Sequence, residues 1–113
     1  MKEQATFPRA ERLRRRADFA RLYRTGVKVE GGGVILFSQL GGPGRRVGIS
    51  ASRRIGGSVE RNRARRRLRE AYRLNKGLLP EGVELLLVAR PPVLTQTFEK
   101  TCRDVAAGFR KVK

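Results

Sequence analysis

Positive charge is crowded into one stretch of this sequence. Between Arg45 and Arg73 stand eleven arginines but only two carboxylates, Glu60 and Glu70, so the stretch carries a net charge of +9. The whole chain of 113 residues carries a net charge of +17. A folded domain with this excess repels itself unless a polyanion neutralises it, and nucleic acid is the usual polyanion. The sequence therefore predicts a nucleic-acid-binding protein whose fold carries these arginines on its surface.

An anionic membrane is the other polyanion to consider. Membrane binding would require an amphipathic helix with bulky apolar residues, yet the chain has no Trp and no apolar run of transmembrane length. The N-terminus also lacks the apolar stretch of a signal peptide. A single cysteine, Cys102, excludes an internal disulfide. We therefore expect a cytoplasmic protein with no membrane partner.

The sequence offers little for catalysis. It has no histidine, which removes the commonest general base and the commonest metal ligand. The carboxylates are scattered, and only Glu81 and Glu84 lie close together, beside the start of a predicted strand. No glycine-rich phosphate loop and no serine-hydrolase motif is present. We predict no catalytic residue, no metal site and no cofactor in the protein itself.

The N-terminal part is predicted to contain a tail and a short helix. Residues 1–12 are polar and aperiodic and are expected to form a flexible basic tail. After Leu13, apolar residues fall at helical spacing, with Asp18 as the expected cap and Gly26 as the expected end. The arginines just ahead of this helix are Arg14, Arg15 and Arg16.

Three segments have the pattern of β-strands. A β-branched and aromatic run from Val34 to Leu40 is entered through glycines and left through the turn sequence Gly-Gly-Pro-Gly. Residues 47–52 alternate between apolar and small side chains, so these two segments are predicted to pair as an antiparallel hairpin. The continuous apolar run from Val83 to Ala89 is bounded by prolines and predicts a central, well-buried strand.

Two longer amphipathic helices flank the last predicted strand. The first is expected to be capped by Ser58 and to end at Asn75 and Gly77. Its apolar stripe is edged by guanidinium groups and consists of Ala64, Leu68, Ala71 and Tyr72. The second starts near Thr97, and its apolar positions are Phe98, Cys102, Val105, Phe109 and Val112. On the first helix, like charges repeat at spacings of three and four, which is tolerable when phosphates neutralise them.

The predicted order of elements is α-β-β-α-β-α in a single domain spanning residues 1–113. The middle β-α-β unit can form a parallel pair of strands, so one small central sheet covered by helices is the economical arrangement. The predicted fold class is a two-layer α/β sandwich of the α+β type.

The stretch from Arg46 to Arg73, RVGISASRRIGGSVERNRARRRLREAYR, closely resembles the signature of the bacterial ribonuclease P protein family. Its centre is Arg61-Asn62-Arg63, and it contains a strand that ends in Ser52-Arg53-Arg54-Ile55-Gly56. The flanking order also matches, with Asp18-Phe19, Tyr23 and Gly26 before it and VELLLVARP and a closing helix after it. The likeness spans Leu13–Val112 and is far more specific than an isolated Arg-Asn-Arg.

The resemblance implies a ribosomal protein S5 domain 2-like fold with a left-handed β-α-β crossover, although most such crossovers are right-handed. It also implies two RNA sites. The arginine-rich helix and the preceding loop would bind a catalytic RNA through Arg53, Arg54, Arg61, Asn62, Arg63, Arg65, Arg66, Arg67, Arg69 and Arg73. The sheet face and first helix would bind the single-stranded 5′ leader of precursor tRNA through Phe19, Tyr23, Phe37, Arg14, Arg15 and Arg16. Aromatic rings beside a basic patch stack unpaired bases, but from the pattern alone such rings are more often core residues.

The function implied by the resemblance is that of the non-catalytic protein subunit of ribonuclease P, a ribonucleoprotein endonuclease that removes the 5′ leader from precursor tRNA. The RNA subunit would bind Mg²⁺ and hydrolyse the phosphodiester, and the protein would join it as a monomer in a 1:1 complex. The residues alone leave two alternatives open. One is a basic ribosomal or other structural RNA-binding protein; the other is a protein-only nuclease, which would need clustered metal-binding carboxylates.

Overall fold

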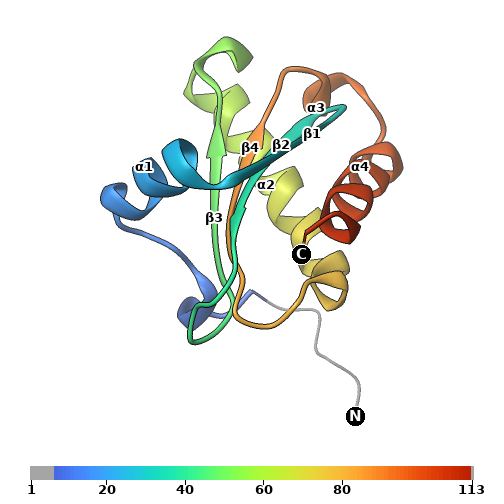
Figure 1. Cartoon of the computed structure of the whole chain (residues 1–113). Helices are drawn as coiled ribbons and strands as arrows, with labels where there is room; N and C mark the ends of the chain where they lie inside the picture. The colour runs from blue at the N-terminus through green and yellow to red at the C-terminus, as the bar shows by residue number, and fades with distance from the viewer. Residues whose placement is uncertain (1–6, 113) are drawn as a thin grey trace.

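The computed structural model describes residues 7–112 and places four strands in one sheet, with helices against both of its faces (Figure 1). Its elements in chain order are the 3-10 helix η1 (Arg9–Glu11), α1 (Arg16–Thr25), β1 (Val27–Gly31), β2 (Val34–Gln39), β3 (Arg46–Ala51), the 3-10 helix η2 (Arg53–Ile55), α2 (Ser58–Asn75), the 3-10 helix η3 (Lys76–Leu78), β4 (Glu84–Ala89), the short α3 (Pro92–Thr95) and α4 (Phe98–Arg110). The predicted α/β sandwich is confirmed, with one strand more than the sequence pattern indicates.

Strand β4 is central in the sheet, whose order is β1-β2-β4-β3. It pairs antiparallel with β2 and parallel with β3. The predicted central strand is therefore confirmed, whereas the predicted hairpin between residues 34–40 and 47–52 is wrong because β4 lies between those strands. Leu85, Leu86 and Leu87 are at most 2% exposed. A strand that is apolar on both faces is best buried with a neighbour on each edge and a layer on each face.

The sequence pattern does not predict strand β1. It pairs with β2 so that Gly31 lies opposite Val34, which leaves Gly32 and Gly33 as the turn. Gly32 has a φ of 53°, a left-handed conformation that glycine adopts without strain. β1 is an edge strand, and Val27 remains 67% exposed. The available signal was the Gly-Gly pair between two short β-prone runs.

The larger core lies between the sheet and helices α2 and α4. The predicted stripe on α2 is confirmed: Ala64, Leu68, Ala71 and Tyr72 are all 0% exposed. They pack in one cluster with side chains of the sheet and α4, among them Leu36 and Phe109. The predicted start of the last helix is also confirmed, because the Thr97 side chain accepts a hydrogen bond from the backbone N–H of Lys100 at 3.1 Å. Within residues 7–112, none of the helices has the length and apolar character needed to span a membrane.

The crossover from β3 through α2 to β4 is left-handed. In Figure 1 both strands run upward, β4 lies to the right of β3, and α2 lies behind the sheet. Right-handed crossovers predominate strongly in such units. The resemblance implies the rarer hand, and the structure has it.

A smaller core lies on the opposite face, beneath α1. Leu22 is fully buried there and packs with Leu13, Phe37 and Leu86. Arg21 holds α1 to the sheet because its Nη2 lies 3.0 Å from Oε1 of Glu84, the first residue of β4. Helix α1 covers only part of this face.

Two helix starts differ from the prediction. Helix α1 begins at Arg16 after Arg15, so Asp18 lies inside the first turn and pairs with Arg21 at 3.2 Å. Helix α2 begins at Ser58 itself, with Gly57 at the N-cap position. Neither predicted cap residue therefore caps its helix.

The segment before α1 is packed against the body. The Phe7 ring lies edge-on to Tyr72 of α2, with centroids 4.9 Å apart. Arg12 forms an isolated parallel bridge with Val47 of β3, and the Leu13 N–H donates to the Val47 carbonyl at 2.9 Å. The predicted tail is therefore wrong for residues 7–12, while residues 1–6 lie outside the described part of the chain.

Candidate nucleic-acid interface

The face of the sheet that α1 leaves partly open is organised in rows across the strands. Side chains alternate along each strand, so every second residue of β2 and β4 points to this face. One row is Phe37, Leu86 and Gly48, and the next is Ile35, Val88 and Ser50. The floor is therefore apolar along β2 and β4 and small or polar along β3.

Helix α1 places two aromatic rings at one end of this floor. Phe19 lies over Gly48, where an added Cβ would be 2.7 Å from the Phe19 Cζ atom. Tyr23, one turn further on, is 65% exposed, and its ring centroid lies 4.9 Å from that of Phe37 with 33° between the planes. Phe37 is only 6% exposed. The three predicted aromatic residues therefore come together, and Tyr23 is the ring that faces solvent.

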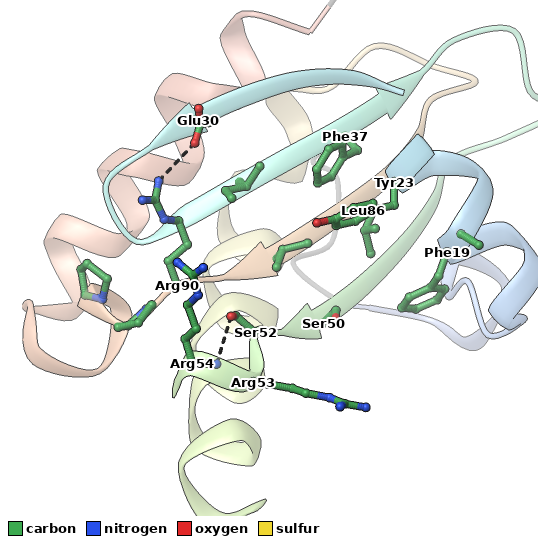
Figure 2. Close-up of a pocket in the computed structure, with 15 residues that line it drawn as sticks. Phe19, Tyr23, Glu30, Phe37, Ser50, Ser52, Arg53, Arg54, Leu86 and Arg90 are labelled. Carbon is green, nitrogen blue, oxygen red and sulfur yellow. Dashed lines mark hydrogen bonds and ion pairs between the residues drawn. The ribbon is translucent and has the colours of Figure 1, made fainter. Parts of the chain in front are cut away.

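Arginines gather at the other end of the floor. Arg53 and Arg54 belong to η2, directly after β3, and Arg90 directly follows β4. The Ser52 hydroxyl accepts a hydrogen bond from the Arg54 N–H at 3.2 Å, and the Arg90 N–H donates to the Gly33 carbonyl at 2.9 Å. These bonds fix the backbone from which the arginine side chains extend. In Figure 2, Arg54 and Arg90 lie at one end of the hollow and the aromatic rings at the other.

The floor, the rings and the arginines enclose a groove of about 880 Å³, which we call the sheet groove (Figure 2). Its lining combines Phe19, Tyr23 and Phe37 with Arg53, Arg54 and Arg90. Aromatic rings stack with unpaired bases, and guanidinium groups bind phosphates. The sheet groove therefore has the chemistry to hold a single nucleic-acid strand, with bases at the aromatic end and phosphates at the basic end.

The predicted RNA-binding residues of α2 divide into exposed and anchored side chains. Those that are exposed are Asn62, Arg63, Arg66 and Arg69. Arg67 is anchored, because its Nη2 donates to the Gln96 carbonyl at 3.0 Å and its guanidinium lies 6.0 Å from the Phe98 ring centroid. Arg67 thus links α2 to the start of α4.

Three other arginines of α2 have intramolecular partners. Arg61 reaches back past the helix start and donates to the Gly56 carbonyl at 3.0 Å, and Arg65 donates to the Asn62 side chain. Arg73 pairs with Glu70 at 2.8 Å, and this hydrogen bond lowers the pKa of the Glu70 carboxyl. Four of the arginines predicted to bind RNA therefore contact groups of the protein itself. They are Arg61, Arg65, Arg67 and Arg73.

A second, smaller groove lies between α2 and the segment before α1, and we call it the helix groove. It has a volume of about 150 Å³ and is lined by Phe7, Arg12, Leu13, Arg14, Phe19, Val47, Ile49, Arg65 and Arg69. Arginines stand on both of its walls, which suits a phosphate backbone. Arg14 thus borders the helix groove instead of the sheet groove, while Arg15 and Arg16 are exposed at the start of α1.

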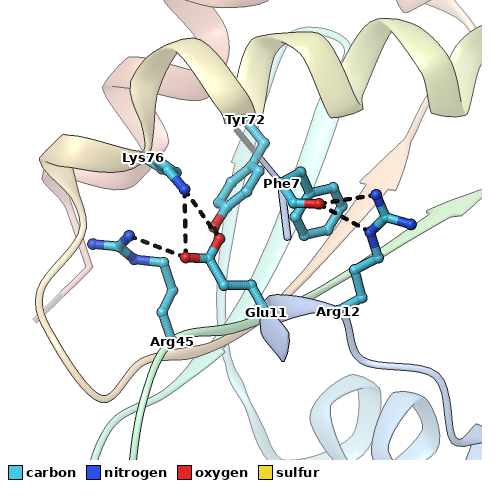
Figure 3. A network of polar contacts seen from close by, with 6 residues as sticks. All are labelled: Phe7, Glu11, Arg12, Arg45, Tyr72 and Lys76. Carbon is cyan, nitrogen blue, oxygen red and sulfur yellow. Dashed lines mark hydrogen bonds and ion pairs between the residues drawn. The ribbon is translucent and has the colours of Figure 1, made fainter. Parts of the chain in front are cut away.

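A partly buried carboxylate, Glu11, ties the segment before α1 to the rest of the protein (Figure 3). Glu11 accepts a hydrogen bond from the Tyr72 hydroxyl at 2.8 Å and lies 3.2 Å from Lys76 Nζ and 3.8 Å from Arg45 Nη1. The Lys76 side chain is only 5% exposed. We call these four residues the Glu11 clasp. It joins the segment before α1 to the end of α2 and to the start of β3.

Comparison with known proteins identifies the family. The profile of the Ribonuclease P family matches residues 7–113. This chain belongs to the ribonuclease P protein family. The ribonuclease P protein component of Dictyoglomus thermophilum is 38% identical over 87 residues, covering 76% of this chain and 72% of that relative. The component from Thermotoga maritima is 35% identical over 96 residues, covering 84% of this chain and 81% of the relative.

Solved structures share the fold. The ribonuclease P protein from Thermotoga maritima superposes with a TM-score of 0.79 at 25% identity, covering 91% of this chain and 98% of the other. A structure from Staphylococcus aureus gives a TM-score of 0.75 at 25% identity, covering 88% and 93%. The chain is therefore a protein component of ribonuclease P, a ribonucleoprotein endoribonuclease of tRNA processing. Family membership decides against a basic ribosomal or other structural RNA-binding protein.

The arrangement of the acidic side chains bears on whether the protein itself could be a metal-dependent nuclease. Within residues 7–112, no three Cys, Asp or Glu side chains form a group that could hold a metal ion. A protein-only nuclease would need such a group. That the protein contributes no catalytic residue, metal or cofactor stays a prediction.

Sequence reasoning missed Arg90, Phe7 and Arg12. Arg90 follows the apolar strand directly, and the predicted parallel pairing of its strand with residues 47–52 carried the signal. Parallel strands end at the same edge of a sheet, so arginines placed just after each strand must meet there. Phe7 and Arg12 fell in the segment assigned to a tail.

Proposed function

We propose that this ribonuclease P protein holds the single-stranded 5′ leader of precursor tRNA in the sheet groove. The observation that carries the proposal is the division of the groove into an aromatic end and an arginine end. The exposed Tyr23 ring offers a stacking surface for a base, and the Phe37 ring packs against it. Arg53 and Arg54 are assigned to the catalytic RNA by the family resemblance, but they line the sheet groove and would contact leader phosphates instead. Mature tRNA lacks the leader, so these contacts would favour the precursor alone.

We further propose that α2 and the helix groove bind the catalytic RNA subunit. The exposed side chains Arg63, Arg66 and Arg69 form a positive surface along α2, and Arg14 lines the helix groove together with Arg69. In this arrangement the RNA subunit, with Mg²⁺ bound to it, hydrolyses the phosphodiester. The protein acts by neutralising phosphates and by fixing the path of the leader. It would do so as a monomer in a 1:1 complex in the cytoplasm.

The leader assignment is tested with Tyr23→Ala in the reconstituted holoenzyme. Loss of one stacked base is worth about 1–3 kcal/mol, so we expect affinity for precursor tRNA to fall about 5- to 150-fold. Affinity for mature tRNA should not change. Leu78→Ala, at a 40% exposed apolar residue of η3, is the matched control. Equal losses for precursor and mature tRNA, or no loss, would contradict the assignment.

The RNA-subunit assignment is tested by salt dependence. Each phosphate contact contributes about 0.7–0.9 to the slope of log affinity against log salt concentration. The triple substitution Arg63→Gln, Arg66→Gln and Arg69→Gln should weaken binding to the RNA subunit and make this slope shallower. Arg103→Gln with Arg110→Gln, two exposed arginines of α4, provides the control. A salt slope unchanged from that of the unsubstituted protein would contradict the assignment.

A further inference from the structure

One acidic side chain lies in the sheet groove. Among the described residues that line it, Glu30 of β1 is the only carboxylate. Strand β1 sets Glu30 beside Ile35 of β2, and Lys28 beside Phe37. Both β1 side chains therefore extend the rows of the groove floor at its outer edge. A carboxylate here repels any phosphate that enters, so its position needs a reason beyond the leader site itself.

The partner of Glu30 is an arginine of the groove. Arg90 Nη1 lies 3.5 Å from Glu30 Oε1, and the dashed line in Figure 2 marks this pair. The Arg90 backbone is fixed by its hydrogen bond to the Gly33 carbonyl. Its side chain therefore starts on the groove floor and extends toward Glu30. Lys28 Nζ lies 3.9 Å from the other carboxylate oxygen of Glu30.

This ion pair is open to solvent and easily exchanged. The side chains of Arg90 and Glu30 are 40% and 54% exposed. Exposed ion pairs are screened by water and salt and change an equilibrium by only about a factor of one to five. A leader phosphate can accept two parallel hydrogen bonds from the guanidinium, in place of the single 3.5 Å contact with Glu30. The pair therefore does not lock Arg90 away from an incoming strand.

We propose that Glu30 is an internal counter-anion that occupies Arg90 until a leader phosphate displaces it. Arg90 is then a phosphate-binding residue at the basic end of the sheet groove, and Glu30 sets how strongly that end binds. This inference rests on the proposed leader site and deepens it. A leader that reaches Arg90 gains a contact but must displace Glu30, whereas a shorter leader leaves the pair intact. Glu30 thus lowers affinity selectively for the longer leaders.

The test is Glu30→Gln in the reconstituted holoenzyme, with precursor tRNAs whose leaders are lengthened one nucleotide at a time. Glutamine keeps the shape and removes the charge. We expect affinity to rise about two- to five-fold for leaders beyond a threshold length, and to stay unchanged for shorter leaders and for mature tRNA. Glu99→Gln, an exposed carboxylate of α4, is the matched control. If Glu30→Gln leaves long-leader affinity unchanged or lowers it, Glu30 is not a competing anion.

A second variant measures the phosphate contact directly. Arg90→Gln should weaken binding above the same threshold length and make the salt slope shallower by about 0.7, the value for one contact with a single strand. An unchanged slope would overturn the role of Arg90. If Tyr23→Ala weakens precursor binding while neither groove-end variant has its expected effect, this inference fails and the leader site stands. If precursor and mature tRNA bind equally to the unsubstituted holoenzyme, both fail.

Discussion

The position of Phe19 depends on the residue beneath it. Gly48 is a buried residue of β3, and the Phe19 ring occupies the space that any larger residue would need. Phe19 in turn forms part of the aromatic end of the sheet groove. A single missing side chain thus allows α1 to lie close to the sheet with its aromatic rings over the floor.

Substitution Gly48→Ala should displace this ring. The added Cβ would lie 2.7 Å from Phe19 Cζ and 3.3 Å from Leu13 Cβ, so a side chain must shift. Overpacking of this kind lowers the free energy of unfolding by about 1–3 kcal/mol. We also expect leader-dependent affinity to fall. Urea unfolding and precursor binding measure the two effects.

The control for this substitution is Gly44→Ala, because a Cβ at Gly44 would meet nothing within 4 Å. If the two variants unfold at the same urea concentration, the close contact between Phe19 and Gly48 is not significant for stability.

Helix α2 combines a fully buried stripe with a crowded positive surface. Like charges three or four residues apart on a helix destabilise it by about 0.2–0.5 kcal/mol for each pair. Arg63, Arg66 and Arg69 form such a row. The helix is held in place by its buried stripe and by anchors such as Arg67, and not by its surface charges.

Removing this row should stabilise the free protein at low salt. Arg63→Gln, Arg66→Gln and Arg69→Gln together should raise the free energy of unfolding by several tenths of a kcal/mol, because glutamine has a similar helix propensity. The gain should shrink in high salt, which screens the repulsion. Urea unfolding at low and high NaCl measures it, with Arg103→Gln and Arg110→Gln as the control. A triple variant that is no more stable than the unsubstituted protein at low salt would contradict the prediction.

The elements also show how far the sequence specifies this fold. The stripe on α2 and the apolar run of β4 carry strong local patterns, so both elements are predicted. The neighbours of β2 are not predicted from the sequence. The local pattern favours pairing of β2 with the next strand in the chain, whereas in the fold β2 pairs with the more apolar β4, which comes last in the chain. Strand β1 is not predicted because an exposed edge strand needs few apolar residues and so has a weak sequence pattern. In the site, the aromatic residues are predicted from the family resemblance. Arg90 could have been predicted from the parallel pairing of β3 and β4, because residues that follow parallel strands meet at the same edge of the sheet.

The Glu11 clasp joins three distant parts of the chain. Burial, together with the hydrogen bond to Glu11, raises the pKa of the Tyr72 hydroxyl well above its ordinary value. The folded protein therefore holds this proton more tightly than the unfolded chain does. The resulting stabilisation is complete below about pH 10, where the unfolded tyrosine is also protonated, and is lost as the pH rises further.

Tyr72→Phe should remove this contribution. We expect the free energy of unfolding to drop by about 1–3 kcal/mol at neutral pH, because Glu11 loses a donor. Above about pH 10 the variant should lose stability less steeply than the unsubstituted protein. Tyr23→Phe, at the exposed tyrosine, is the matched control for removal of a hydroxyl. Identical alkaline slopes for Tyr72→Phe and the unsubstituted protein would show that folding does not raise the pKa of the Tyr72 hydroxyl.

Phe19 lines both the sheet groove and the helix groove. Its ring is therefore a wall that the two grooves share. If the two grooves hold RNA as proposed, a ligand that shifts the shared Phe19 ring on one side would alter the free energy of binding on the other. Linkage is reciprocal, so any help that a bound catalytic RNA gives to leader capture must be returned in equal measure by the leader to the RNA. Under the proposed function, the protein subunit would couple the binding of two nucleic acids, and its contribution would be largest when both are present.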